Sequence, residues 1–277
     1  MATASTLALA AALVVPARAQ PAADPLANLL ALACAPMAGG AQACTAAAPL
    51  WNRDDLALNA VVAAFPAAGF SLRVVPVDAR VDMRALFGAG ACTDAPAVII
   101  GGYFGRDEGS GPYPLGLTVA DSVEASPWLD WRVGGAIVVD ADGDTAIRSW
   151  RDLDADARAG LAQALQVKPI LVSGNANDGI ADQSDRWDRV AFGIADDGSL
   201  VLVGVFGPAG SGWGTGLTLK QFADYIAAIR LPSGAAIDRA INLDGGPSAH
   251  LYLRDGDRFW GALLERYVPN VVCIVVR

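Results

Sequence analysis

The chain has 277 residues, 53% of them hydrophobic, and its 20 basic and 29 acidic side chains leave a net charge of −9 at neutral pH. Nucleic acids and anionic membranes bind proteins through basic surfaces, so this balance argues against both as partners. The sequence has no Ser/Gly-rich linker and no internal repeat, so we expect one large domain with a substantial core.

The N-terminal residues have the pattern of a secretory signal peptide. An apolar run over residues 7–15 precedes Ala17-Arg18-Ala19, a small-x-small cleavage pattern before Gln20. An N-terminal membrane helix is disfavoured, because a span needs roughly 20 apolar residues. We predict a signal peptide at residues 1–19 and a domain at residues 20–277 with a net charge of 19 − 29 = −10. The protein is then secreted or periplasmic, and its mature chain has no membrane span.

The four cysteines all lie in the part of the chain that would be exported. An even number of cysteines in an oxidising compartment predicts two disulfides, for which three pairings are possible. We favour Cys34 with Cys44, which closes a small loop, and Cys92 with Cys273. A zinc site is disfavoured because the chain has no Cys-x-x-Cys pair and only one histidine, so we predict no metal.

The remaining elements follow from apolar periodicity. Alternating or continuous apolar runs predict strands at residues 70–74, 98–100, 170–172, 190–194 and 271–276. Helical spacing predicts longer helices at residues 152–166 and 218–229, with short helical segments after Asp24 and at residues 82–87. The sequence thus predicts an α+β (mixed α/β) single domain with a mixed sheet, hairpins and two longer helices.

Two segments that could suggest a cofactor do not meet the pattern. Residues 140–144 resemble a calcium loop but lack the later Gly and Glu of an EF-hand, so we predict a hairpin turn there. The glycine-rich residues 207–216 have neither Walker nor dinucleotide spacing. We therefore predict no cofactor.

Residues 241–253 place polar side chains inside an apolar strand pattern. Asn242 and Asp244 are two apart and share a face of an extended segment, and Gly245-Gly246-Pro247 then predicts a sharp reversal. A carboxylate at a strand end suits a catalytic role. The alternative is a hairpin in which Asp244 caps its own turn.

Two further segments suggest ligand contacts. Gly101-Gly102-Tyr103-Phe104 follows a buried strand, where the glycines would let the backbone approach a ligand and the aromatic rings would form a sugar platform; the alternative is a bulge with two core aromatics. Arg189 could bind two phosphate oxygens at once, or could be a surface arginine paired with Asp185 or Asp188. Thr218 begins a capping box, and free amides at that helix end can bind anions.

These segments together resemble one family. Asn242-Leu-Asp-Gly-Gly-Pro-Ser248 resembles the signature of the phosphodiester glycosidase family. Residues 101–104, 189–193 and 216–219 resemble further blocks of that family in the same order, so the resemblance covers roughly residues 96–252. The chain departs from the family at Ile100, where an Asn usually precedes the two glycines.

The resemblance implies an exported hydrolase that cleaves a sugar-1-phosphodiester bond in a glycan or envelope polymer. On chemical grounds we assign Asp244 as base or nucleophile and Arg189 as phosphate clamp. The predicted substrate-binding residues are Gly101, Gly102, Tyr103, Phe104, Thr218, Asn242, Gly245, Gly246 and Ser248.

Two other functions remain open from the sequence. A non-catalytic polysaccharide-binding protein of the cell envelope would suit the Ile100 departure and the aromatic residues. A serine hydrolase could use Ser248 with His250, although the Gly-x-Ser-x-Gly elbow is absent and neighbours two apart on one strand make a poor base pair.

Overall fold

The computed structural model describes residues 25–50, 53–77, 86, 92–107, 111–208, 215–261 and 268–277. The predicted signal peptide and all of the helical segment at 82–87 except Leu86 lie outside these residues. In the part that is described, no helix combines the length and apolar character needed to cross a membrane.

The strands of the described chain form four β-sheets. The first sheet has the order β1 (Ala33–Pro36), β2 (Gln42–Leu50), β3 (Arg53–Phe65), β16 (Leu200–Phe206), β15 (Arg189–Ala195), β17 (Ile237–Asn242), β13 (Ile170–Ser173), β14 (Ala176–Asn177). The second has the order β19 (Arg258–Gly261), β18 (His250–Leu253), β5 (Ala97–Ile100), β20 (Asn270–Val276), β4 (Phe70–Pro76). The third has the order β11 (Thr145–Ser149), β10 (Gly135–Val139), β12 (Gln163–Val167), β8 (Thr118–Ala120), β9 (Val123–Ser126). A hairpin of β6 (Phe104–Asp107) and β7 (Gly111–Pro114) forms the fourth.

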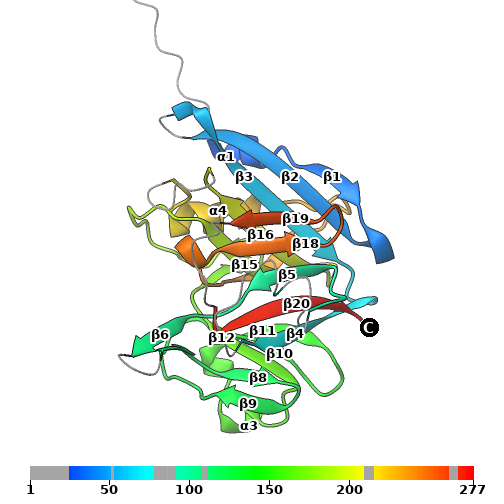
Figure 1. Ribbon diagram of the computed structural model, residues 1–277, viewed down its shortest axis with the longest axis vertical. Coiled ribbons are helices and arrows are strands. Elements are labelled where there is room, and N and C mark those ends of the chain that lie inside the picture. The colour runs from blue at the N-terminus through cyan, green and yellow to red at the C-terminus, as the bar shows by residue number, and fades with distance from the viewer. Residues whose placement is uncertain are drawn as a thin grey trace, which may run out of the picture.

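The helices of the described part are short and few. They are α1 (Pro25–Leu29), α3 (Ala155–Arg158) and α4 (Leu219–Ala228), with 3-10 turns η1 (Ala38–Gly40), η2 (Trp150–Asp152) and η3 (Gly246–Ser248). The main core lies where the first three sheets meet. The other face of the first sheet is covered by α1 and α4. In Figure 1 the third sheet and α3 lie at the opposite end of the molecule from β1, β2 and β3.

The predicted α+β class with a mixed sheet and two longer helices is wrong. The fold is mostly β, and the strand pairings between the described residues are antiparallel. The error lies at residues 152–166, which form the end of η2, the one-turn α3 and then the strand β12. Gly160 has a φ of +80°, a left-handed conformation that interrupts any helix there.

The apolar spacing in that segment arises from two separate cores. Leu153 and Leu161 pack on the outer face of the third sheet, whereas Leu165 points into the main core. Strand β12 lies between β10 and β8 and is buried along its whole length. Burial on both faces removes the alternation by which a strand is recognised, so the segment has helical spacing without being a helix.

Several other predictions are confirmed. Helix α4 begins at the predicted capping box, and residues 140–144 join β10 to β11 as a hairpin. Strand β20 is paired on both sides, with β4 and β5. Both favoured disulfides are present, Cys34 with Cys44 and Cys92 with Cys273.

Gln166 on β12 is a buried polar side chain whose hydrogen bonds are all made to backbone. Its Oε1 accepts from the amides of Leu117 (2.9 Å) and Leu129 (3.0 Å), and its Nε2 donates to the carbonyl of Leu129 (2.6 Å). The side chain therefore fastens the segment around residues 117–129 to the centre of the third sheet.

Replacing Gln166 with leucine should lower the free energy of unfolding by at least about 2 kcal/mol, because two amides and one carbonyl would be buried without partners. Denaturant unfolding would measure the loss. The matched control is Arg132→Ala, which removes an exposed ion pair to Asp130 (3.2 Å) and should cost less than about 0.5 kcal/mol. Equal losses in the two variants would contradict this account.

Asp188 is a second buried polar residue, at the junction leading into β15. It is 8% exposed, and its Oδ1 accepts a hydrogen bond from the amide of Gly207 at 2.7 Å. Burial raises the pKa of this carboxyl above its ordinary value, and the Gly207 amide only partly offsets that shift. The folded state therefore holds the Asp188 proton more tightly than the unfolded chain does.

This pKa shift predicts a pH-dependent stability. The stabilisation by the proton on Asp188 is complete below the ordinary pKa of 3.8 and is lost as the pH rises through the raised folded pKa. Asp188→Asn should therefore gain stability relative to the wild type as the pH increases across that window. Unfolding free energies of both proteins, measured against pH, test this, with exposed Asp142→Asn as the control for one lost charge. A difference that stays flat or changes in the opposite direction would be inconsistent with it.

Candidate active site

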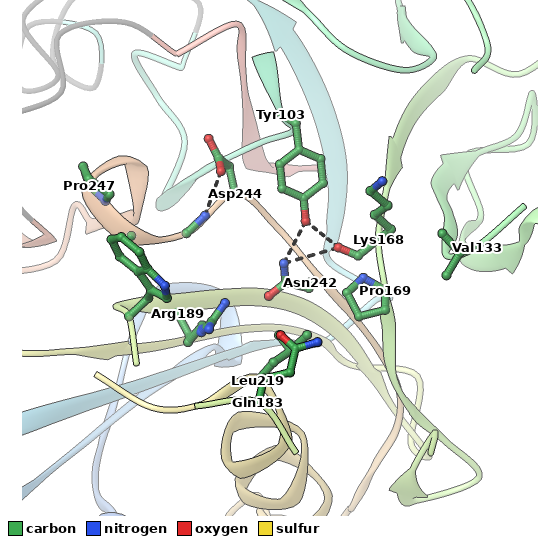
Figure 2. Close-up of a pocket in the computed structure, with 13 residues that line it drawn as sticks. Tyr103, Val133, Lys168, Pro169, Gln183, Arg189, Leu219, Asn242, Asp244 and Pro247 are labelled. Carbon is green, nitrogen blue, oxygen red and sulfur yellow. Dashed lines mark hydrogen bonds between the residues drawn. The ribbon is translucent and has the colours of Figure 1, made fainter. Parts of the chain in front are cut away.

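The chain forms a cavity of about 500 Å³ where the ends of β15 and β17 meet the loop before β13. Six of the predicted site residues line it, namely Tyr103, Arg189, Asn242, Asp244, Gly245 and Gly246. The volume lies in the range of pockets that bind small ligands. Figure 2 shows the residues around this cavity.

Strand pairing brings the two predicted catalytic residues to the same edge of the first sheet. Strands β15 and β17 are antiparallel neighbours in which Ala191 lies opposite Asn242. The start of β15, at Arg189, and the residues after β17, at Asp244, therefore lie close together. The sheet thus places a guanidinium and a carboxylate in one cavity.

The end of β17 does not turn back as a hairpin. Strand β17 belongs to the first sheet and β18 to the second, and residues 245–248 cross between them through η3. Gly246 has a φ of +61°, and a Cβ there would lie 2.9 Å from the Trp187 ring. Glycine is therefore required at this position by both conformation and space.

Asn242 is held by hydrogen bonds that fix its amide orientation. Its Nδ2 donates to the Leu243 carbonyl (2.7 Å), the Tyr103 hydroxyl (2.8 Å) and the Lys168 carbonyl (3.3 Å). The Tyr103 hydroxyl in turn donates to the Lys168 carbonyl, and Figure 2 shows the three groups together. Two of the three acceptors are carbonyls, so the amide nitrogen and not the oxygen must face them.

The Tyr103 hydroxyl stays protonated. Burial raises its pKa well above the ordinary value, and the negative charge of Asp244 raises it further, while the Asn242 hydrogen bond and Arg189 act in the opposite direction. Its proton is already donated to a backbone carbonyl. Tyr103 therefore shapes the cavity wall and is not arranged to protonate a leaving group.

The Arg189 guanidinium is held by hydrogen bonds to backbone carbonyls and not by the side chains of Asp185 or Asp188, which the sequence suggested as partners. Its Nε donates to the Leu217 carbonyl (3.1 Å) and its Nη2 to the main-chain carbonyl of Asp185 (3.2 Å). Among the residues that the structure describes, no side-chain carboxylate forms an ion pair with it. Burial lowers its pKa, with Tyr103 and Asp185 opposing that shift, yet a guanidinium remains charged. The cavity thus contains a fixed cation that can bind an anion.

Gly101 and Gly102 pack against protein and do not line the cavity. Their amides donate to Asn270, from Gly101 to the carbonyl (3.1 Å) and from Gly102 to the side-chain oxygen (2.6 Å). A Cβ on Gly101 would lie 2.0 Å from that oxygen. The glycines therefore allow the close approach that holds Tyr103 in place.

Three other predicted binding residues also lie outside the set that lines the cavity. Phe104 is in β6, and Thr218 caps α4 by accepting from the Gln221 amide at 3.2 Å. Ser248 is 6% exposed within η3, and Nδ1 of His250 lies 2.7 Å from the Ser248 carbonyl oxygen. This histidine is fully buried, and its Nδ1 contacts the Ser248 backbone and not the Ser248 hydroxyl.

Sequence reasoning missed about half of the cavity lining. The missed residues are Val133, Lys168, Pro169, Gln183, Trp187, Leu219 and Pro247. Trp187 could have been found, because it lies two residues before Arg189 and so shares a face with it in an extended segment. Lys168 was not among the predicted site residues. Its place in the cavity depends on long-range packing that no local pattern shows.

No group of three or more potential metal ligands among His, Cys, Asp and Glu occurs within the described ranges.

Comparison with known proteins gives one match to a family and several to solved structures. The model of the phosphodiester glycosidase family matches residues 93–275, which is 183 of the 277 residues. No curated protein matches the chain.

Three similar structures share the fold at low sequence identity. A hypothetical protein from Synechocystis has a TM-score of 0.60 and 14% identity, with 89% of this chain and 64% of that one covered. The catalytic domain of zebrafish N-acetylglucosamine-1-phosphodiester alpha-N-acetylglucosaminidase, auto-inhibited by its pro-peptide, has a TM-score of 0.56 and 17% identity, with 89% and 82% covered. A protein from Burkholderia pseudomallei described as exported has a TM-score of 0.53 and 14% identity, with 79% and 74% covered.

The chain thus spans less than two thirds of the Synechocystis protein. The family match covers all of the strands that build the cavity, from β5 to β17. This chain belongs to the phosphodiester glycosidase family.

Proposed function

We propose that the protein hydrolyses a sugar-1-phosphodiester, with Asp244 as base or nucleophile and Arg189 as the phosphate clamp. The observation that carries the proposal is the presence of both side chains in one cavity, at the ends of neighbouring strands. The family match supports the reaction class.

In the proposed reaction, the bond between the anomeric carbon and the phosphate oxygen breaks. Water supplies a hydroxyl group to the sugar carbon and a proton that passes to the solvent, and the phosphate leaves as a monoester on the other partner. The transition state resembles an oxocarbenium ion, which a nearby carboxylate stabilises. Because a phosphate leaving group has a low pKa, it needs little help from an acid, and one carboxylate is enough.

The backbone fixes both reacting groups. The amide of Asp244 donates to the Gly101 carbonyl (3.0 Å), and the amide of Gly245 donates to the Asp244 Oδ1 (3.0 Å). The two carbonyl contacts of Arg189 orient its guanidinium in the same way. Such prior orientation lowers the entropic cost of reaching the transition state.

Ile100, the position of the departure from the family, is not among the residues that line the cavity. Ile100 is fully buried in the main core and pairs with Val271. The two disulfides favour an oxidising compartment, so we propose that the protein acts outside the cytoplasm. The proposed substrate is a glycan or envelope polymer.

Asp244→Asn should lower kcat by a factor of roughly 10² to 10⁴, because an amide can act neither as base nor as nucleophile. Arg189→Ala should also abolish most turnover, and Arg189→Lys should restore only part of it, because an ammonium cannot bind two phosphate oxygens as a fork does. Sugar release from a panel of α-sugar-1-phosphodiesters would measure these effects. Full turnover by folded Asp244→Asn would rule out the carboxylate role.

Ser248→Ala separates this proposal from the serine hydrolase. Because Ser248 lies outside the cavity lining, its loss should lower turnover less than about tenfold, whereas loss of a catalytic serine costs far more. The same sugar-release measurement applies, and a covalent serine-reactive phosphonate should fail to label the protein. Labelling at Ser248 would favour the serine hydrolase. Saturable glycan binding without product from any panel member would favour the polysaccharide-binding protein.

A further inference from the structure

The chain contains only two lysines, and they lie in different environments. Lys220 is on the exposed side of α4, where its Nζ forms an ion pair with Asp224 at 2.6 Å. Lys168 lines the cavity, and no carboxylate in the described part of the chain lies within ion-pair distance of it. An acidic protein thus has one of its two lysines in the candidate active site.

The structure holds Lys168 in place at both its backbone and its side chain. Its carbonyl accepts hydrogen bonds from the Tyr103 hydroxyl and the Asn242 amide. Its Nζ lies 4.5 Å from the centre of the Trp131 ring, and that ring meets Tyr103 edge to face with centroids 6.1 Å apart. A cation over an aromatic face is stabilised there without being neutralised, so it can still bind an anion.

The two cations of the cavity lie on different sides of it. Figure 2 shows Arg189 and Lys168 on opposite sides of Tyr103 and Asn242, with Asp244 on the Arg189 side. The reacting groups are therefore gathered around Arg189, and the lysine charge lies apart from them.

We propose that Lys168 binds a second anionic group of the substrate, separate from the phosphodiester that is cleaved. The proposal rests on the proposed function. One phosphodiester carries one negative charge, for which the Arg189 fork is sufficient. A second fixed cation at the other side of the cavity suits a substrate with a further phosphate or carboxylate, as in an anionic polymer of repeating units.

The experiment compares three substrates that share one α-sugar-1-phosphodiester bond. In the first substrate the phosphate carries a neutral methyl group. In the second a glycerol phosphate replaces the methyl group, so the leaving group has a second phosphate. The third keeps the methyl group and has a uronic acid as the sugar, so the second charge lies on the sugar. The wild type should show a higher kcat/KM for at least one of the two doubly charged substrates than for the methyl substrate. Which of them is preferred reveals whether the second charge lies on the leaving group or on the sugar.

The variants are Lys168→Met, Lys168→Arg and Lys220→Met. The preference is the kcat/KM for the doubly charged substrate divided by that for the methyl substrate. Lys168→Met should lower this ratio by about tenfold, mainly by raising KM for the doubly charged substrate, as expected for the loss of one charged hydrogen bond. Lys168→Arg keeps the charge and should retain most of the preference. Lys220→Met is the matched control for net charge and should leave the ratio unchanged. Lys168→Met should fold, because the substitution removes none of the backbone contacts at residue 168.

An unchanged ratio in Lys168→Met, or an equal loss for all three substrates, would overturn the proposal while leaving the proposed function intact. The equal loss would place Lys168 at the cleaved phosphate instead. Absence of cleavage of every substrate by the wild type would overturn the proposed function and this proposal with it.

Discussion

The candidate site depends on how the backbone after β17 is held. Four backbone N–H groups there donate to carbonyls in different parts of the chain. They run from Asn242 to Pro169 (3.0 Å), from Leu243 to Val190 (3.1 Å), from Asp244 to Gly101 (3.0 Å) and from Gly246 to Asp188 (2.8 Å). Each acceptor belongs to a segment that contributes a cavity residue or its neighbour. The positions of Lys168, Arg189 and Tyr103 relative to Asp244 are thus set by main-chain hydrogen bonds, which no side-chain substitution removes directly.

Part of this site could be predicted from the sequence and part could not. The two-residue spacing of Asn242 and Asp244 and the glycines after them correctly marked a carboxylate at a strand end, and Arg189 was correctly placed at the start of a strand. The glycines at 101 and 102 were read as a surface for ligand, whereas they pack against Asn270. A glycine pattern shows that something approaches closely, but not whether it is a ligand or another part of the protein.

The same limit explains the error in the fold. The strand β12 contains two buried glutamines and lies at the end of residues 152–166, whose apolar spacing is close to that of a helix, so the local pattern favoured the helix. Its polar atoms are satisfied only by residues far away, such as Val74, whose amide donates to Gln163 at 3.0 Å. Where burial on both faces and distant hydrogen bonds decide the structure, spacing along the chain carries little information. Capped helix α4 and hairpin β10–β11 were predictable because their signals are local.

The position of β20 has a consequence for the order in which the protein can fold. This strand lies between β4 and β5, and Cys273 within it is joined to Cys92, 181 residues earlier. During synthesis the facing edges of β4 and β5 therefore have no strand to pair with until nearly all of this sequence has been made. Unpaired apolar edges attract other chains. This sheet is therefore completed late, and the disulfide between Cys92 and Cys273 then holds β20 in its place between the two strands.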